Sequence, residues 1–103
     1  MESWECGKGW YPLIEELISQ LNTSAEFEDI LVLQIKEKFG GLRYYISHYP
    51  TEQVDAWIRE AEEESEVTCE VCGRLGKIRN DIGWILTLCK ECYNKRKKER
   101  GYR

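Results

Sequence analysis

The sequence predicts an α+β protein, in which a helix–β-hairpin–helix body precedes a small module built around four cysteines. Apolar residues recur at helical spacing in two segments, and a β-type segment with two adjacent glycines lies between them. Two C-x₂-C pairs follow near the carboxyl end. The chain of 103 residues has room for one domain and a small metal-stapled unit. We expect the body to span residues 1–67 and the metal module to span residues 68–103.

Charge divides the chain at the same place. The net charge is −4, but residues 1–67 contain 5 Lys and Arg against 15 Asp and Glu, whereas residues 68–103 contain 10 against 4. This division suits either a globular part with an arm for an anionic partner or two parts that attract each other. No apolar run approaches the ~18 residues of a membrane span, and residues 1–5 do not resemble a secretory signal. We expect a cytoplasmic protein with reduced thiols and no membrane partner.

Two amphipathic helices are expected in the body. Residues 11–21 place apolar side chains three and four positions apart, and Pro12 suits the first turn of a helix. The second helix starts after Thr51, a candidate N-cap, and its apolar face has Val54, Trp57, Ile58 and Ala61. The acidic residues 60–66 are interpreted as a solvated helix face and linker.

A β-hairpin is expected between the two helices. Residues 30–39 and 42–47 have β-type composition, and Gly40 and Gly41 between them suit a tight primed turn. Pairing Phe39 with Leu42 places Lys36 opposite Tyr45, and period-two alternation then sorts the faces. One face, with Leu33, Ile35, Phe39, Leu42, Tyr44 and Ile46, should pack on the helices. The other face has Gln34, Lys36, Lys38, Arg43, Tyr45 and Ser47.

The basic and aromatic face of the hairpin is the first candidate binding site. Lys36, Lys38 and Arg43 are three of the five basic residues in an otherwise acidic body. Cations beside aromatic rings suit a nucleotide-like ligand, because the cation pairs with phosphate and the ring stacks on a base. We assign Tyr45 and Trp10 to the same site. In the competing interpretation Trp10 completes a small core and helices cover this sheet face.

The basic carboxyl-terminal segment is the second candidate. Its positive residues are Lys95, Arg96, Lys97, Lys98 and Arg100. Such a run favours phosphate binding that depends on salt and does not read base sequence. The competing interpretation is that these cations complement a helix dipole and keep a chain end solvated.

The cysteine pairs, Cys69 with Cys72 and Cys89 with Cys92, are separated by sixteen residues. Two such pairs form the closed tetrahedral ligand set of one structural zinc ion, Zn²⁺. Disulfides, unligated thiols, an iron–sulfur cluster and a redox C-x-x-C motif are the alternatives, and zinc is favoured among them. Residues 75–79 and 84–88 are expected to be strands around a turn at residues 80–81, and a helix should follow the second pair.

This order of knuckle, hairpin and helix resembles the treble-clef zinc fingers. Treble-clef His-Asn-His nucleases need histidines on the hairpin and helix, but the single histidine, His48, precedes the module. Cys6 and His48 form at most a weak nucleophile–base candidate, because nothing in the sequence brings them together. We therefore expect a protein without enzymatic activity.

Four segments resemble a group of small phage and prophage proteins: GWYPLI at 9–14, KEKFGGLRYY at 36–45, SEVTCEVCG at 65–73 and GWILTLC at 83–89. The likeness covers nearly the whole chain. It implies a phage accessory protein in the host cytoplasm and does not imply an activity. Small phage proteins commonly act by stoichiometric binding, and from this association we expect the chain to inhibit or sequester a host component. That component would be a host protein, including an anti-phage defence protein, or a nucleotide signal. The second hypothesis is a nucleic-acid-binding regulator that uses the basic helix.

Overall fold

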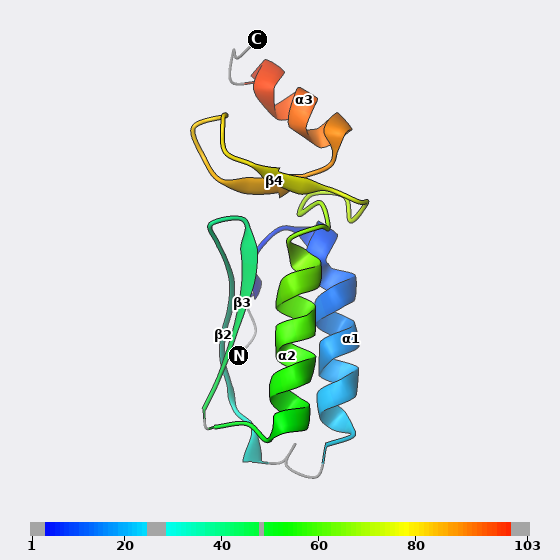
Figure 1. Cartoon of the computed structure of the whole chain (residues 1–103), viewed down its shortest axis with the longest axis vertical. Helices are drawn as coiled ribbons and strands as arrows, with labels where there is room; N and C mark the ends of the chain where they lie inside the picture. Colours follow the sequence, from blue (N-terminus) through cyan, green and yellow to red (C-terminus); the bar gives the residue numbers. More distant parts are fainter. Residues whose placement is uncertain (1–3, 25–28, 48, 100–103) are drawn as a thin grey trace.

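Two helices cover one face of a three-stranded sheet, and a smaller module lies at one end of this body (Figure 1). The computed structural model describes residues 4–24, 29–47 and 49–99. The molecule is elongated, with extents of 50 × 20 × 19 Å. The body contains β1 (Trp4–Glu5), a 3₁₀ turn (Lys8–Trp10), α1 (Tyr11–Asn22), β2 (Val32–Lys38), β3 (Gly41–Ile46) and α2 (Glu52–Ser65). The module contains β4 (Lys77–Arg79), β5 (Leu86–Leu88) and α3 (Lys90–Glu99).

Both predicted body helices form at their predicted positions. Helix α1 has Pro12 in its first turn, where the missing N–H breaks no helical hydrogen bond. Helix α2 starts after Thr51, whose side-chain oxygen accepts a hydrogen bond of 3.4 Å from the Val54 N–H. The two helices and the sheet share one core, to which the helices contribute Ile14, Leu17, Leu21, Val54, Ile58 and Ala61. Among the described residues, no helix has the length and apolar character needed to cross a membrane.

The hairpin also forms, but its turn lies one residue earlier than predicted. Phe39 and Gly40 are its central residues, and their φ angles of 53° and 84° have the signs of a type I′ turn. Gly41 belongs to β3, and Lys36 pairs with Arg43 instead of Tyr45. The register differs from the predicted one by two residues. Because side chains alternate with period two, this difference leaves the paired residues on their predicted faces.

Two residues assigned to the core face are nevertheless exposed. Phe39 is 66% exposed because it lies in the turn rather than in a strand. Leu33 is 56% exposed because a β-bulge between Val32 and Gln34 interrupts the alternation, and Val32 packs against the core. The prediction that Phe39 and Leu33 pack under the helices is therefore wrong.

Strand β1 lies at one edge of the sheet and the end of α2 lies against the other, and neither contact was predicted from the sequence. At one edge the short strand β1 runs parallel to β2, and Glu5 lies beside Lys36. At the other edge the Tyr44 N–H donates to the Glu62 carboxylate at 3.1 Å, and the Leu42 N–H donates to the Ser65 hydroxyl at 2.9 Å. The acidic end of α2 therefore caps the free edge of β3, which would otherwise present unpaired backbone groups.

The module has a small buried cluster of its own. Strands β4 and β5 pair antiparallel, but residues 80–85 form a longer connection than the predicted turn at residues 80–81. Helix α3 begins directly after Cys89 and carries Cys92 in its first turn. The cluster consists of Cys69, Ile82, Leu86, Leu88 and Cys89, and none of these residues belongs to the body core.

The segment before α1 joins the module to the body through close backbone contacts. The Gly9 N–H donates to the Glu70 carbonyl at 2.7 Å, and the Gly7 N–H donates to the Glu70 carboxylate at 2.8 Å. A Cβ atom at Gly9 would lie 2.2 Å from the carbonyl oxygen of Cys69, so only glycine fits there. A second contact joins the two-stranded β4–β5 ribbon of the module to the turn between β2 and β3, where the Thr87 hydroxyl donates to the Gly40 carbonyl at 2.6 Å.

Candidate metal centre and binding surfaces

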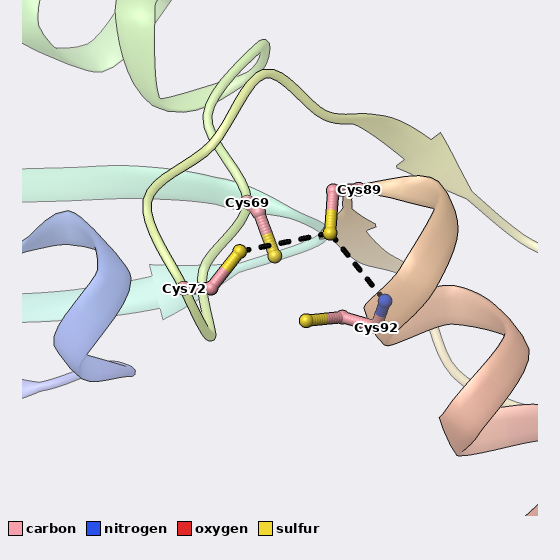
Figure 2. Close-up of side chains that lie close together, drawn as sticks. All are labelled: Cys69, Cys72, Cys89 and Cys92. Atoms are coloured by element: carbon pink, nitrogen blue, oxygen red, sulfur yellow. Dashed lines mark hydrogen bonds between the residues drawn. The ribbon is translucent and has the colours of Figure 1, made fainter.

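Four cysteine side chains from two chain segments point toward one another (Figure 2). Cys69 and Cys72 lie on the loop that follows α2, Cys89 lies between β5 and α3, and Cys92 lies in α3. Their Sγ atoms all lie within 4.8 Å of one another, and the Sγ atoms of Cys72 and Cys89 are 3.6 Å apart. A tetrahedral site with metal–sulfur bonds of ~2.3 Å places its sulfurs ~3.8 Å apart. The four thiols are unbridged and fit a metal ion in both spacing and chemistry.

A tight backbone turn aims the first two thiols at the cluster. Gly73 follows Cys72 with a φ of 85° and donates its N–H to the Cys69 carbonyl at 2.9 Å. The Cys69 N–H in turn donates to the Arg74 carbonyl at 2.7 Å. The positive φ strongly favours glycine, because a Cβ atom is strained in this conformation.

Electrostatics in the cluster favour a bound cation. Burial raises the pKa of Cys69, but backbone N–H groups of Cys89, Cys72 and Val71 oppose burial and bring it down to about 7. Burial and the neighbouring thiols raise the pKa of Cys92 far above its ordinary value. Four thiolates this close repel one another, and a divalent cation bound between them would supply the charge that lets all four deprotonate.

The structure brings four of the five residues of the first candidate binding site onto one surface. Lys36, Lys38, Arg43 and Tyr45 lie on the sheet face opposite the helices, which α1 and α2 leave uncovered (Figure 1). We call these four residues the basic hairpin face. Lys36 and Arg43 are directly opposite each other and half-buried, whereas Lys38 and Tyr45 are exposed.

Trp10 does not belong to this surface. Its side chain is 0% exposed in the body core, and its indole N–H donates to the Thr68 carbonyl at 2.8 Å. Its assignment to the binding site is therefore wrong. The sequence alone fits an indole that binds a ligand as well as one that packs in the core. In the structure the indole is buried in the core, and its hydrogen bond links the body to the start of the module.

The second candidate site lies on helix α3, at the far end of the molecule (Figure 1). Lys95, Arg96, Lys97 and Lys98 follow one another on this helix, which buries none of its described residues. The Lys97 ammonium lies 5.1 Å from the centroid of the Tyr93 ring, and the Arg79 guanidinium lies 4.1 Å from the same ring. Arg100, the last member of the predicted set, lies outside the described residues.

The structure does not strengthen the case for Cys6 and His48 as a nucleophile–base pair. Burial, together with the charges of Glu70 and Glu37, raises the pKa of Cys6 to about 11. A thiol with so high a pKa is a poor nucleophile near neutral pH. His48 lies outside the described residues.

A surface notch of about 420 Å³ was missed by the sequence analysis. Its lining comes from the β2–β3 turn and from the loop between β4 and β5, namely Glu37, Lys38, Phe39, Gly83, Trp84 and Ile85. These two segments lie more than forty residues apart in the chain, so no local pattern predicts their contact. One sequence feature could have indicated this site. Phe39 directly precedes a glycine, and a two-residue turn disfavours a large side chain at that position.

Comparisons with known proteins found no family model that matches the chain and no similar curated protein or solved structure. The cysteine cluster and the two charged surfaces are therefore the features of the molecule that bear on its function.

Proposed function

We propose that this chain is a small non-enzymatic binding protein that acts by stoichiometric binding to a host protein. The observation that supports this most is the basic hairpin face, a group of cations on an uncovered sheet surface of an acidic body. The resemblance of the chain to small phage proteins supports three further parts of the proposal. The protein would be encoded by a phage, it would act in the host cytoplasm, and it would inhibit a host component such as a defence protein.

We propose that Cys69, Cys72, Cys89 and Cys92 hold one structural Zn²⁺ in a treble-clef arrangement. The first two cysteines lie on a glycine-containing knuckle, a two-stranded ribbon follows, and the last cysteine lies in the first turn of a helix. Four thiolates fill the coordination sphere of zinc, so the ion would cross-link the module and leave no position for a reacting water. Its role is to hold α3 and the knuckle together.

The basic hairpin face has the properties of a prepared binding surface. The half-buried Lys36 and Arg43 side chains have less freedom to lose on binding than fully exposed ones. The Arg43 guanidinium is also held by a hydrogen bond of 3.1 Å to the Leu42 carbonyl. A positive patch on an otherwise acidic body steers an anionic partner to this face.

Charge reversal tests the basic hairpin face. The wild-type protein is purified from host cells under native conditions, and mass spectrometry identifies the protein that copurifies in stoichiometric amount. Lys36→Glu with Arg43→Glu should release this partner, whereas the control Lys8→Glu with Arg59→Glu changes the charge equally but leaves the face intact. A folded double variant at residues 36 and 43 that still retains the partner would exclude this face as the site.

The second candidate function is nucleic-acid binding by helix α3, favoured by four consecutive cations, of which Lys95 and Lys98 are exposed and Arg96 and Lys97 are half-buried. Electrophoretic shift of a 30-base-pair duplex over a salt series tests it, because binding dominated by phosphate falls steeply with salt. Replacing Lys95, Arg96, Lys97 and Lys98 by glutamine should then abolish the shift. Absence of any shift at low salt removes this function.

A further inference from the structure

The notch between the hairpin turn and the module is built by both parts of the molecule. The Thr87 hydroxyl bonds the Gly40 carbonyl, and a Cβ atom at Gly40 would lie 3.3 Å from the Ile85 side chain, so the two parts are in contact there. Above this contact the side chains of Phe39 and Trp84 are 66% and 60% exposed, and Ile85 is 37% exposed. A contiguous exposed apolar surface with a polar rim is typical of a protein-interaction site.

Phe39 occupies its position at a cost to the fold. Its φ of 53° is in the left-handed region, where a residue other than glycine is strained by roughly 1 kcal/mol or more. Asparagine or glycine would suit this turn position better. Burial does not offset the strain, because most of the ring is exposed to solvent. The Lys38 ammonium lies 5.6 Å from the centroid of this ring, but an exposed contact of this kind is worth only about 0.5–1 kcal/mol and at best balances the strain. The large aromatic ring therefore stands where folding alone gains little from it.

The charges beside the notch favour an acidic occupant. Lys38 lines the notch and belongs to the basic hairpin face, together with Lys36 and Arg43, so the two surfaces are continuous. The lining also contains Glu37, but its carboxylate accepts a hydrogen bond of 2.8 Å from the Gly40 N–H and is already engaged within the turn. An approaching chain thus meets an apolar notch with Lys38 at its rim, and Lys36 and Arg43 follow along the same two strands, with Glu5 beside Lys36.

We propose that the Phe39–Trp84 notch receives an apolar side chain of a partner protein, from a segment whose flanking Asp or Glu residues pair with the basic hairpin face. This inference rests on the proposed function and specifies the partner's chemistry. A buried apolar anchor supplies most of the affinity in such interfaces, while charges at the rim supply orientation and speed of association. Body and module must be docked for the notch to exist, so binding also depends on the metal site.

The Phe39→Asn variant separates a binding role from a structural one. Asparagine tolerates a positive φ, so the variant should unfold at a higher temperature than the wild type while its binding weakens at least about tenfold. Trp84→Ser should weaken binding similarly. Leu75→Ser is the control, because Leu75 is exposed on the module but does not line the notch. A Phe39→Asn variant that is less stable than the wild type and binds as tightly would overturn the proposal.

The probe is a displayed library of random 16-residue peptides, selected on the full-length, metal-loaded protein. We expect enriched peptides to contain an aromatic or branched apolar residue flanked by Asp or Glu. Synthesised examples, measured by fluorescence anisotropy, should lose at least about tenfold in affinity for Phe39→Asn and for Lys36→Glu with Arg43→Glu. Failure to enrich peptides, or enriched peptides without acidic residues, would overturn the proposal.

The remaining outcomes distinguish this inference from the proposed function. If the copurified host protein is released by the Lys36 and Arg43 reversals but not by Phe39→Asn, the notch fails and the basic hairpin face stands. If neither variant releases it, the proposed function fails as well. A shift of the Trp84 indole NMR signal on adding AMP or GMP would assign the notch to a nucleotide. Dimerisation abolished by Trp84→Ser, measured by sedimentation, would assign it to a second copy of this chain.

Discussion

At the scale of single residues, Tyr44 has a buried hydroxyl group that bears on the free energy of unfolding. Its hydroxyl oxygen is buried and has no hydrogen-bond partner within the described part of the chain. The residue lines an apolar cavity of about 330 Å³, and burial raises its pKa to about 12. A buried hydroxyl without a partner loses its hydration and gains nothing in exchange.

We therefore expect Tyr44→Phe to raise the free energy of unfolding by up to about 1 kcal/mol, because the substitution removes only the unpaired hydroxyl. Urea denaturation followed by circular dichroism measures the change. The control is Tyr45→Phe on the exposed face of the same strand, which should leave the free energy of unfolding unchanged. A loss of stability in Tyr44→Phe would show that the hydroxyl has a partner in solution.

Glu62 makes stability depend on pH through its contact with the sheet edge. Burial raises its pKa above the ordinary 4.5, against the opposing effects of the Tyr44 N–H and Arg43, while Asp55 and Glu66 add to the rise. The folded state then binds the proton more tightly than the unfolded state. The free energy of unfolding contributed by this group accordingly falls as pH rises from about 4.5 through the raised pKa.

The Glu62→Gln variant should remove this dependence, because the amide oxygen still accepts the Tyr44 N–H but does not ionise. Its stability relative to the wild type should increase with pH across this window, by no more than about 1 kcal/mol because the carboxylate is half-exposed. Denaturant midpoints at pH 4.5 and pH 7 test the expectation. Glu60→Gln, on the exposed side of α2, is the control, and an equal pH effect in both variants would contradict the assignment.

At the scale of elements, the contact between the 3₁₀ turn and the knuckle depends on glycine at position 9. A Cβ atom there would lie 2.2 Å from the Cys69 carbonyl oxygen and 2.6 Å from the Gly73 nitrogen, both of which are backbone atoms. Gly9→Ala should therefore separate the module from the body and lower the free energy of unfolding by about 2 kcal/mol or more. Thermal unfolding measures the loss, and Lys8→Ala in the same turn, at an exposed position, should change little.

Helices α1 and α2 were predictable because their signals are local: apolar spacing, Pro12 and the Thr51 cap. The position of the hairpin turn was not, since its contacts with Thr87 lie far away in the sequence. Strand β1 has only two residues, too few to show alternation, and the bulge at Leu33 leaves no signature in composition. Local patterns identify elements, whereas turn register, edges and bulges depend on contacts between elements.

The candidate sites follow the same division. Spacing alone identified the four cysteines, because two knuckles must each present two thiols to one point. The basic hairpin face survived a wrong register because the error was an even number of residues. Trp10 was misassigned because its burial depends on packing against α1, α2 and the sheet, which lie far apart in sequence. The notch was missed because its two walls meet only in the folded molecule.

At the scale of the whole molecule, the body and the module differ in how much of their buried core consists of candidate metal ligands. Among the described residues, the body core contains ten buried residues from α1, α2, the sheet and the turn before α1, and none of them belongs to the cysteine cluster. Within residues 68–99, the part of the module that the structure describes, the buried cluster has five residues, and two of them are cysteines of the candidate metal cluster. Helix α3 has no fully buried side chain among its described residues. Its position depends on the half-buried Cys92 and Tyr93, which pack against this cluster, and on the Tyr93 contacts with Asp81 and Arg79.

We therefore expect one zinc ion per chain by elemental analysis and selective unfolding of the module when a chelator removes it. The NMR signals of α3 and the β4–β5 ribbon should collapse toward random-coil positions, whereas those of α1 and α2 should remain dispersed. Cys92→Ser should reproduce this state, and Cys6→Ser should keep one zinc ion and the native spectrum, since Cys6 lies outside the cluster.

The chelated protein should also lose peptide binding at the notch, because separation of the module removes Trp84 from its place opposite Phe39. Metal-free protein with a native spectrum would contradict a structural role for the ion.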